Sequence, residues 1–188
     1  GLINVNLDKR ELTSIAKKIN KLKIEAVAIC FLHSYKNSIH EKEAKKILGE
    51  LLSPDIFLCT SYEILPEIRE YERTSTTVVN AYLGPVIKSY LGNFSKRILD
   101  VGISAPCYVM QSSGGQMLFK SAIRSPAYLL ESGPAAGVIA AVELAMKKNI
   151  KEVITLDIGG TTAKTALIEN FEPKRTSEYE VGSGINLS

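Results

Sequence analysis

The sequence has only three cysteines in 188 residues, at Cys30, Cys59 and Cys107. They lie far apart in apolar runs, and no Cys-x-x-Cys pair is present. An odd number with this spacing argues against a disulfide framework and against a cysteine zinc site. We therefore expect reduced thiols and a cytoplasmic protein.

Long apolar runs and a strong charge of one sign are also absent. No stretch reaches the roughly 18 apolar residues of a membrane-spanning helix, and the N-terminus lacks a signal-peptide pattern. The 23 lysines and arginines against 20 acidic residues give a net charge of +3. The lysines between Lys17 and Lys23 lack interleaved aromatics, so they predict a solvated helix face. We expect neither a membrane nor a nucleic acid partner.

What is present is the composition of a globular domain, with 45% hydrophobic and 23% charged residues. Helix-strand-helix-strand order in the first 60 residues predicts a crossover unit with parallel strands. Asp8 is expected to cap the first helix. Periodicity predicts helices over 8–22, 39–52, 66–99 and 132–149, and strands over 26–32, 56–59, 107–111, 153–157 and 162–168, with an edge strand from Pro173 on.

The segment from Pro66 to about Leu99 is the longest periodic stretch. Apolar residues recur every four positions in two adjacent rows, one beginning at Val78 and the other at Val79, and together they predict one broad apolar stripe. Pro66 suits a first helical position. Pro85 lies inside the pattern, and its missing amide hydrogen predicts a kink or a break there.

The most informative stretch is VITLDIGGTTAKTALI at Val153–Ile168. An apolar strand ends in an aspartate, a Gly-Gly-Thr-Thr turn follows, and a second apolar strand begins. Glycines let backbone amides approach phosphate oxygens, and threonine hydroxyls add donors. The sequence has neither the GxxxxGK[ST] loop nor a GxGxxG turn that opens a helix. The pattern predicts a phosphate-binding hairpin, and an ordinary hairpin turn is the alternative.

This stretch resembles the second phosphate hairpin of the actin-like ATPase superfamily. The segment ESGPAAGVIAAVELA at Glu131–Ala145 is similar to the interdomain connecting helix that precedes that hairpin. The resemblance implies an α/β fold made of ribonuclease H-like, actin-like ATPase lobes, with a mixed sheet and flanking helices. It also implies that a sugar-kinase-like phosphotransferase and a non-catalytic actin-like or chaperone ATPase module are alternative functions.

Four further segments resemble the hydantoinase A / 5-oxoprolinase family. They are AICFLHSYKNSIHE at 28–41, ILPEIREYERTSTTVVNAYLGPVIKSYL at 64–91, VMQSSGG at 109–115 and LESGPAAGV at 130–138. The TTAK variant at 161–164, with SEYEVGSG at 177–184, is similar to the branch of N-methylhydantoinases and acetone-carboxylase ATP subunits. The oxoprolinase branch more often carries an acidic residue where Lys164 stands.

The family resemblance implies a chemistry. ATP, with Mg²⁺ or Mn²⁺, activates a cyclic amide (hydantoin, N-methylhydantoin or 5-oxoproline) by phosphorylation, and a hydantoinase B-like partner subunit completes the reaction. Asp157 and Lys164 are then the expected catalytic residues, with Asp157 as the metal ligand. Lys164 either reaches phosphate or faces solvent. The expected phosphate-binding residues are Gly159, Gly160, Thr161 and Thr162.

A second set of candidates lies outside the hairpin. It consists of His33, Arg69, Glu72, Arg73 and Thr74, which we expect to contact substrate or the other lobe. The alternatives are a structural histidine and a capped, ion-paired, exposed helix turn.

The resemblance also divides the chain. Residues 1–130 would end the first lobe, 131–150 would be the connecting helix, and 151–188 would begin the second ATPase lobe. An actin-like site needs a first hairpin upstream of Gly1 and an adenosine-binding part beyond Ser188. We therefore expect an internal fragment that, in isolation, neither hydrolyses ATP nor binds it tightly.

Overall fold

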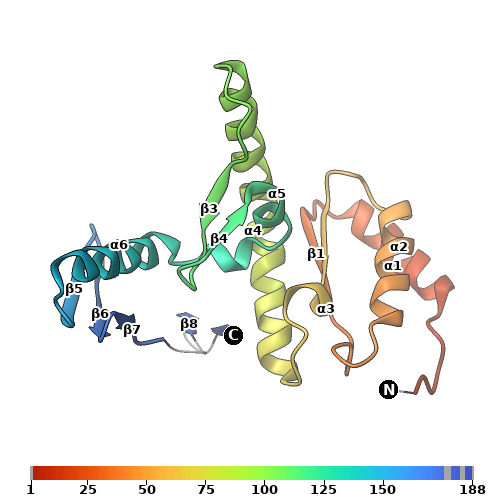
Figure 1. The fold of residues 1–188 in the computed structure, drawn as a ribbon. Helices are drawn as coiled ribbons and strands as arrows, with labels where there is room; N and C mark the ends of the chain where they lie inside the picture. The colour runs from red at the N-terminus through yellow and green to blue at the C-terminus, as the bar shows by residue number, and fades with distance from the viewer. Residues whose placement is uncertain (1, 176–178, 183–184, 188) are drawn as a thin grey trace. The chain divides into compact units, whose positions relative to one another are not determined.

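The computed structural model describes residues 2–175, 179–182 and 185–187 (Figure 1). The chain divides into two compact units. The first comprises Gly1–Arg97, Ile123–Ala127 and Glu178–Ser188, and the second comprises Ile98–Ala122 and Tyr128–Ser177. Each is described separately below.

The first unit begins with the predicted crossover. Helix α1 (Lys9–Lys21) and strand β1 (Ala26–Ile29) are followed by α2 (Ile39–Leu51) and β2 (Phe57–Thr60). The two strands pair in parallel, with Ala26 opposite Phe57, which confirms the crossover. Asp8 caps α1 as expected, because its carboxylate accepts from the Arg10 and Glu11 amides.

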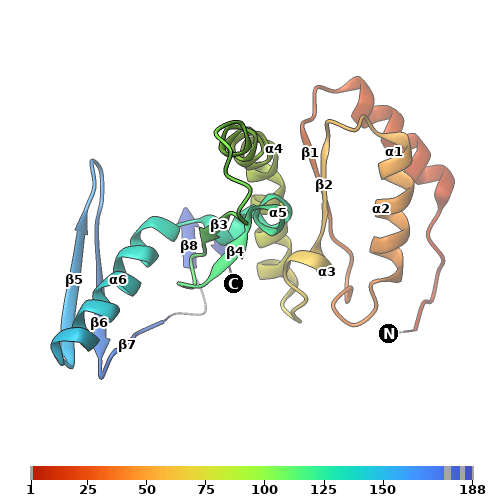
Figure 2. The same cartoon turned by 45° about the horizontal axis from the view of Figure 1, so that its top comes forward.

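The two strands are covered on both faces (Figures 1 and 2). Helices α1 and α2 lie on one side, where Leu12, Ala44 and Leu48 form a buried cluster with Ile29. On the other side a second cluster joins Phe57 and Cys59 to residues beyond β2, including Ala81 of the long helix α4. Burial on both faces explains why these strands read as short continuous apolar runs.

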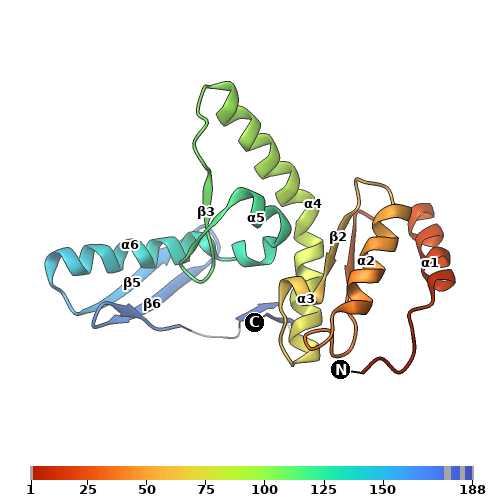
Figure 3. The ribbon, with the colours of Figure 1, turned by 45° about the vertical axis from the view of Figure 1, so that its right-hand side comes forward.

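Helix α4 (Glu70–Asp100) is the longest element. The predicted start at Pro66 is wrong. A separate short helix, α3 (Ser61–Ile64), ends just before Pro66, and the backbone ladder of α4 begins only where the Arg73 amide donates to the Arg69 carbonyl. Pro85 does not break α4. Figure 3 shows the helix bending along its length, as a proline inside a helix favours.

The apolar rows of α4 differ in burial. Val79 and Ile87 are half-buried and Leu91 is buried, whereas Val78, Tyr82, Val86 and Tyr90 are 51% to 81% exposed. Both rows belong to the predicted apolar stripe, but within the part of the chain that the structure describes the second row is the more buried, and Tyr90 of the first row stacks on Phe94.

The second unit contains two hairpins and a helix. Strands β3 (Tyr108–Met110) and β4 (Gln116–Leu118) pair antiparallel around the predicted loop. Gly114 has φ +83° and lies so close to Ile139 that a Cβ there would be 2.8 Å from the isoleucine side chain. Helix α6 (Ser132–Lys148) then packs against β5 (Glu152–Ile158), β6 (Ala163–Glu169) and β7 (Glu172–Pro173).

Some elements were not predicted from the sequence. These are β4, the short helix α5 (Phe119–Arg124) and the 3-10 turn η1 (Pro126–Leu129). The expected edge strand from Pro173 on corresponds to β7 and, further along, to β8 (Tyr179–Gly182) paired with β9 (Ile185–Leu187). No helix among the described residues is long and apolar enough to cross a membrane.

Candidate functional site

The predicted phosphate hairpin is formed by β5 and β6. The strands pair antiparallel from Glu152 opposite Glu169 to Ile158 opposite Ala163. The turn between them closes through the Gly159 amide, which donates to the Thr162 carbonyl at 2.9 Å. Gly160 has open space where a Cβ would be. The turn is therefore narrow and exposed, and its backbone is accessible to a ligand.

The two faces of the hairpin have different surroundings. Residues alternate between faces along a strand, so Val153 and Thr155 share one face with their partners Ile168 and Ala166. That face packs toward α6 and includes the fully buried Ile168. On the other face Ile154, Leu156 and Ile158 are 73%, 63% and 69% exposed.

Asp157 and Lys164 are direct cross-strand neighbours, one pair below the turn. By alternation they lie on the face that α6 covers. A directly opposed acid and base in an antiparallel ladder attract each other. The hairpin thus places the two predicted catalytic residues opposite each other at the base of the glycine-threonine turn.

Lys164 also forms an ion pair with Glu131, the residue that precedes α6. Glu131 has a left-handed backbone, with φ 58°. Neither expectation for Lys164 anticipated this partner, because Glu131 is 33 positions away and no local pattern joins them. The lysine therefore links the start of α6 to the hairpin, and its contact with phosphate stays a prediction.

Asp157 is the residue predicted to hold the metal. In the described residues no group of three or more histidine, cysteine or acidic side chains converges on one point. A single carboxylate beside a phosphate-binding turn fits Mg²⁺, since this ion is usually held by one or two carboxylates, waters and substrate phosphates. Asp157 could fill that role beside the turn.

The second set of candidates lies where β1 and β2 end. Arg73 is fully buried. Its guanidinium donates to Ser61 Oγ at 3.1 Å and to the carbonyls of Glu67 and Phe31 at 2.9 and 2.8 Å, and it pairs with Glu70. A buried charge requires such partners. Arg73 therefore ties the loop after β1 to the start of α4.

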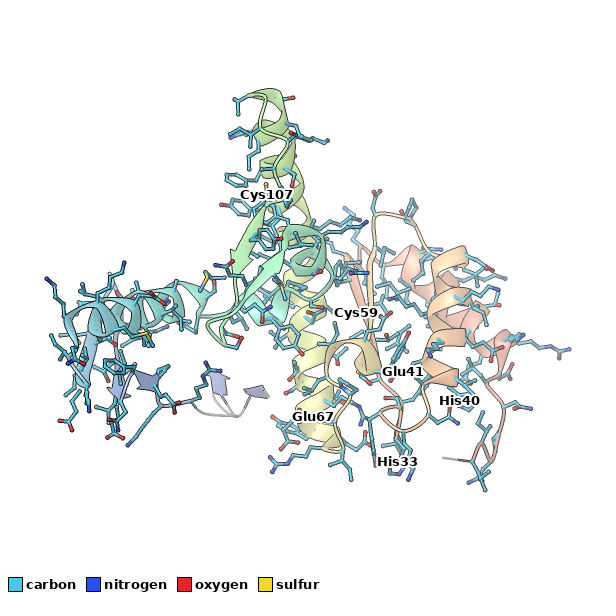
Figure 4. The ribbon with its side chains drawn as sticks, viewed as in Figure 1. His33, His40, Glu41, Cys59, Glu67 and Cys107 are labelled. Carbon is cyan, nitrogen blue, oxygen red and sulfur yellow. The ribbon has the colours of Figure 1, made fainter. Side chains whose placement is uncertain are left out.

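Glu41 extends this buried network from the first turn of α2. Its carboxylate accepts from the Phe31 amide at 2.8 Å, from Ser61 Oγ at 2.6 Å and from the Tyr62 amide at 2.9 Å. Ser61 is thus shared by Glu41 and Arg73. Figure 4 labels Glu41 and Glu67 within the unit. The sequence did not indicate this role, since a glutamate in a helix's first turn is usually exposed.

The structure brings His33 to Arg73 through Glu70. The His33 amide donates to Glu70 Oε1 at 3.0 Å, and the same oxygen lies 3.8 Å from His33 Nδ1. Arg69 and Glu72 instead approach each other at 3.8 Å. The expected contacts of these residues with substrate or another lobe stay predictions.

Thr74 lies outside this network and contacts the thiol of Cys30. Burial raises the pKa of Cys30, although bonds to Thr77 and Thr74 oppose that change. Burial also raises the pKa of Cys59 to about 11. Both thiols are therefore protonated at neutral pH and are poor nucleophiles. All three cysteines are free, as expected.

Comparison with known proteins identifies the family. The hydantoinase/oxoprolinase family model matches residues 73–187, and the model of the hydantoinase/oxoprolinase N-terminal region matches residues 1–52. An uncharacterised protein of Methanocaldococcus jannaschii is 50% identical over 186 residues, which cover 99% of this chain and 27% of that protein.

Two relatives are enzymes. The alpha subunit of caprolactamase from Pseudomonas jessenii is 36% identical over 156 residues, which cover 83% of this chain and 22% of the subunit. The nucleotide-free structure of acetone carboxylase, an enzyme of ATP-dependent acetone carboxylation, matches this chain with a TM-score of 0.80 and 28% identity. The match covers 90% of this chain and 24% of the acetone carboxylase chain.

This match confirms the expected α/β class, in which parallel and antiparallel pairs occur in separate small sheets. The chain spans about a quarter of the length of these relatives. With two family models covering most of its residues, the chain belongs to the hydantoinase/oxoprolinase family.

Proposed function

We propose that this chain is a segment of an ATP-dependent enzyme that phosphorylates the carbonyl oxygen of a cyclic amide before the ring is opened. Hydantoin, N-methylhydantoin and 5-oxoproline are the substrates we propose. The observation that carries the proposal is the β5–β6 hairpin, which opposes Asp157 to Lys164 beneath an exposed glycine-threonine turn. Family membership supports it.

The amide oxygen attacks the γ-phosphorus of ATP, a new oxygen–phosphorus bond forms, and ADP leaves. A first water adds to the activated carbon, and the ring carbon–nitrogen bond breaks as the nitrogen takes up a proton, which leaves an acyl phosphate. A second water then hydrolyses the acyl phosphate to a carboxylate and inorganic phosphate. Phosphoryl transfer depends mainly on positioning and charge stabilisation, so the chain's own residues act by holding phosphate oxygens.

The turn would provide the donors. Gly160, Thr161 and Thr162 would offer backbone amides and hydroxyls to phosphate oxygens. The Gly159 amide already donates to the Thr162 carbonyl, so Gly159 would contribute by closing the turn. Asp157 would hold Mg²⁺ or Mn²⁺, which when bound neutralises phosphate charge. Lys164 would leave Glu131 to meet the phosphate as a point charge.

We also propose that the active enzyme needs more than this chain. A caprolactamase relative is an alpha subunit, which supports a second, hydantoinase B-like subunit here. We further propose, from the family resemblance, a division into the end of a first lobe (1–130), a connecting helix (131–150) and the start of a second lobe (151–188). The three free cysteines support our proposal of a cytoplasmic location.

Carboxylation of a ketone is a second candidate. The specific observation in its favour is the match to acetone carboxylase at a TM-score of 0.80. Phosphorylation of a ketone's enolate oxygen would use the same hairpin residues. The two proposed functions therefore differ in their substrate and can be distinguished only by testing substrates.

The test is turnover by the whole enzyme that contains this chain, together with its partner subunit. We expect ADP release that depends on hydantoin, N-methylhydantoin or 5-oxoproline and is matched by ring-opened product. Asp157→Asn should lower kcat by about 100-fold or more, the scale of losing one electrostatic group at a reacting centre. Asp55→Asn, an exposed loop aspartate in the first unit, is the control.

The outcomes separate the candidates. ADP release and product formation only with acetone and bicarbonate would establish carboxylation instead. Full turnover by Asp157→Asn, or cyclic amide hydrolysis without ATP, would contradict the assignment of the hairpin.

A further inference from the structure

Both histidines of the chain line one cavity of about 320 Å³ in the first unit. His33 follows β1, and His40 lies in the first turn of α2 (Figure 4). The cavity therefore lies at the carboxyl end of a parallel strand, where open α/β sheets usually bind ligands. Its volume is within the usual range for a small-molecule pocket.

One wall of this cavity is held in place by buried groups. His33 has φ 55°, a left-handed conformation that is unusual for a residue other than glycine. Its amide is fixed by Glu70, and Glu70 is fixed by the buried Arg73, which also binds the carbonyl of Phe31. The backbone of His33 is thus positioned before any ligand arrives, which favours binding.

The lining combines basic and apolar groups. Lys36, His33 and His40 supply nitrogen donors, and the Glu70 carboxylate lies beside the cavity, 3.8 Å from His33 Nδ1. Of the apolar lining residues, Leu2 and Leu32 are 98% and 77% exposed, whereas Ile3 is 40% exposed. Tyr35 is also part of the wall, and its ring lies over the Arg73 guanidinium at 5.5 Å.

We propose that this cavity binds a small organic carboxylate. The carboxylate would lie against Lys36 and the two histidines, and the short hydrocarbon body would lie against Ile3 and the ring of Tyr35. The apolar lining distinguishes this ligand from a bare anion such as phosphate. This proposal does not depend on ATP use at the hairpin, so each can fail without the other.

The test uses the imidazole signals of the full chain in nuclear magnetic resonance at constant pH and ionic strength. Because the chain has two histidines and both line the cavity, every imidazole signal reports on it. Titration with pentanoate should move both sets of signals to saturation. The neutral isostere pentanamide and inorganic phosphate should each have a much smaller effect.

A pair of lysine variants tests the role of charge. Lys36→Gln should weaken pentanoate binding about fivefold, the effect of losing one exposed charge contact. Lys42→Gln is the matched control. Lys42 belongs to α2, lies over the ring of Tyr62 and does not line the cavity. Both variants should keep the dispersed spectrum of the folded chain.

Four results would overturn the proposal. The absence of saturable shifts up to roughly 10 mM pentanoate, a weak binding limit, would show that there is no site. Equal shifts with pentanamide or with phosphate would show that the site is not specific for an organic carboxylate. Equal weakening by the two lysine variants would show that only the overall charge of the chain matters.

Discussion

At the scale of single residues, Lys164 has two carboxylates nearby, Asp157 across the hairpin and Glu131 before α6. The side chains of Lys164 and Glu131 are 33% and 37% exposed, so water weakens their attraction. A lysine that serves phosphate must leave such a partner. Glu131 therefore competes with the nucleotide for Lys164.

This competition gives a prediction for the whole enzyme. Glu131→Gln should raise ATP affinity by about two- to fivefold, the worth of one exposed ion pair. Lys164→Met should lower affinity, and the double variant should bind like Lys164→Met alone, because the glutamate then has no lysine to hold. Calorimetric titration with Mg-ATP measures all three.

The control for this series is Glu169→Gln. Glu169 pairs with Lys174 at 3.4 Å at the opposite end of β6 from the turn, so the substitution removes a similar charge without reaching Lys164. Additive effects of Glu131→Gln and Lys164→Met would show that the two residues do not compete.

The residues of the candidate sites could be named from the sequence, but their partners could not. His33 and Arg73 were both candidates. The residue that links them, Glu70, is 37 positions from His33, so no local pattern indicates the contact. Local charge spacing predicts a capped, ion-paired, exposed helix turn at Glu67–Thr76. The Arg69–Glu72 approach fits that pattern, whereas the full burial of Arg73 depends on the distant carbonyl of Phe31.

At the scale of elements, the approach of α4 to β2 depends on a glycine. A Cβ at Gly84 would overlap the ring of Phe57, a buried residue of the second core cluster. A glycine inside a helix lowers helix stability, and here it allows the strand and the helix to pack closely. Gly92, on the same helix, has open space at the equivalent point.

The pair of glycines gives a matched prediction. Gly84→Ala should destabilise the chain by about 1–3 kcal/mol, because the added methyl overpacks a closed contact. Gly92→Ala should stabilise it slightly, by up to about 1 kcal/mol, through better helix propensity. Urea unfolding followed by circular dichroism measures both, and a stabilising Gly84→Ala would contradict the packing argument.

Periodicity predicted the main helices and strands, because each has a strong repeat of its own. It failed at Pro66 and at Gln116–Leu118. The start of α4 is set by bonds from Arg73 to Arg69 and Glu67, and β4 by pairing with β3. Neither interaction leaves a periodic signal in the sequence.

At the scale of the whole molecule, the chain covers about a quarter of its relatives, and the family resemblance in its motifs was confirmed by the family match. A single phosphate hairpin provides only part of the contacts that a nucleotide needs. The division into lobes at residues 130 and 150 stays a prediction.

The isolated 188-residue chain should accordingly bind Mg-ATP weakly, with a Kd above roughly 100 µM, since most of the binding free energy would be missing. Calorimetric titration of the chain, beside the whole enzyme as a positive control, measures this. A submicromolar Kd for the isolated chain would contradict it.

The open face of β5, with Ile154, Leu156 and Ile158 all more than 60% exposed, has a practical consequence. Every second residue of β5 thus contributes to an exposed apolar patch, and such patches favour association between chains. At concentrations above those used for spectroscopy, the isolated chain should therefore self-associate through this face. Asp157 lies on the same strand, so solubilising substitutions on β5 would be made beside the proposed catalytic residue.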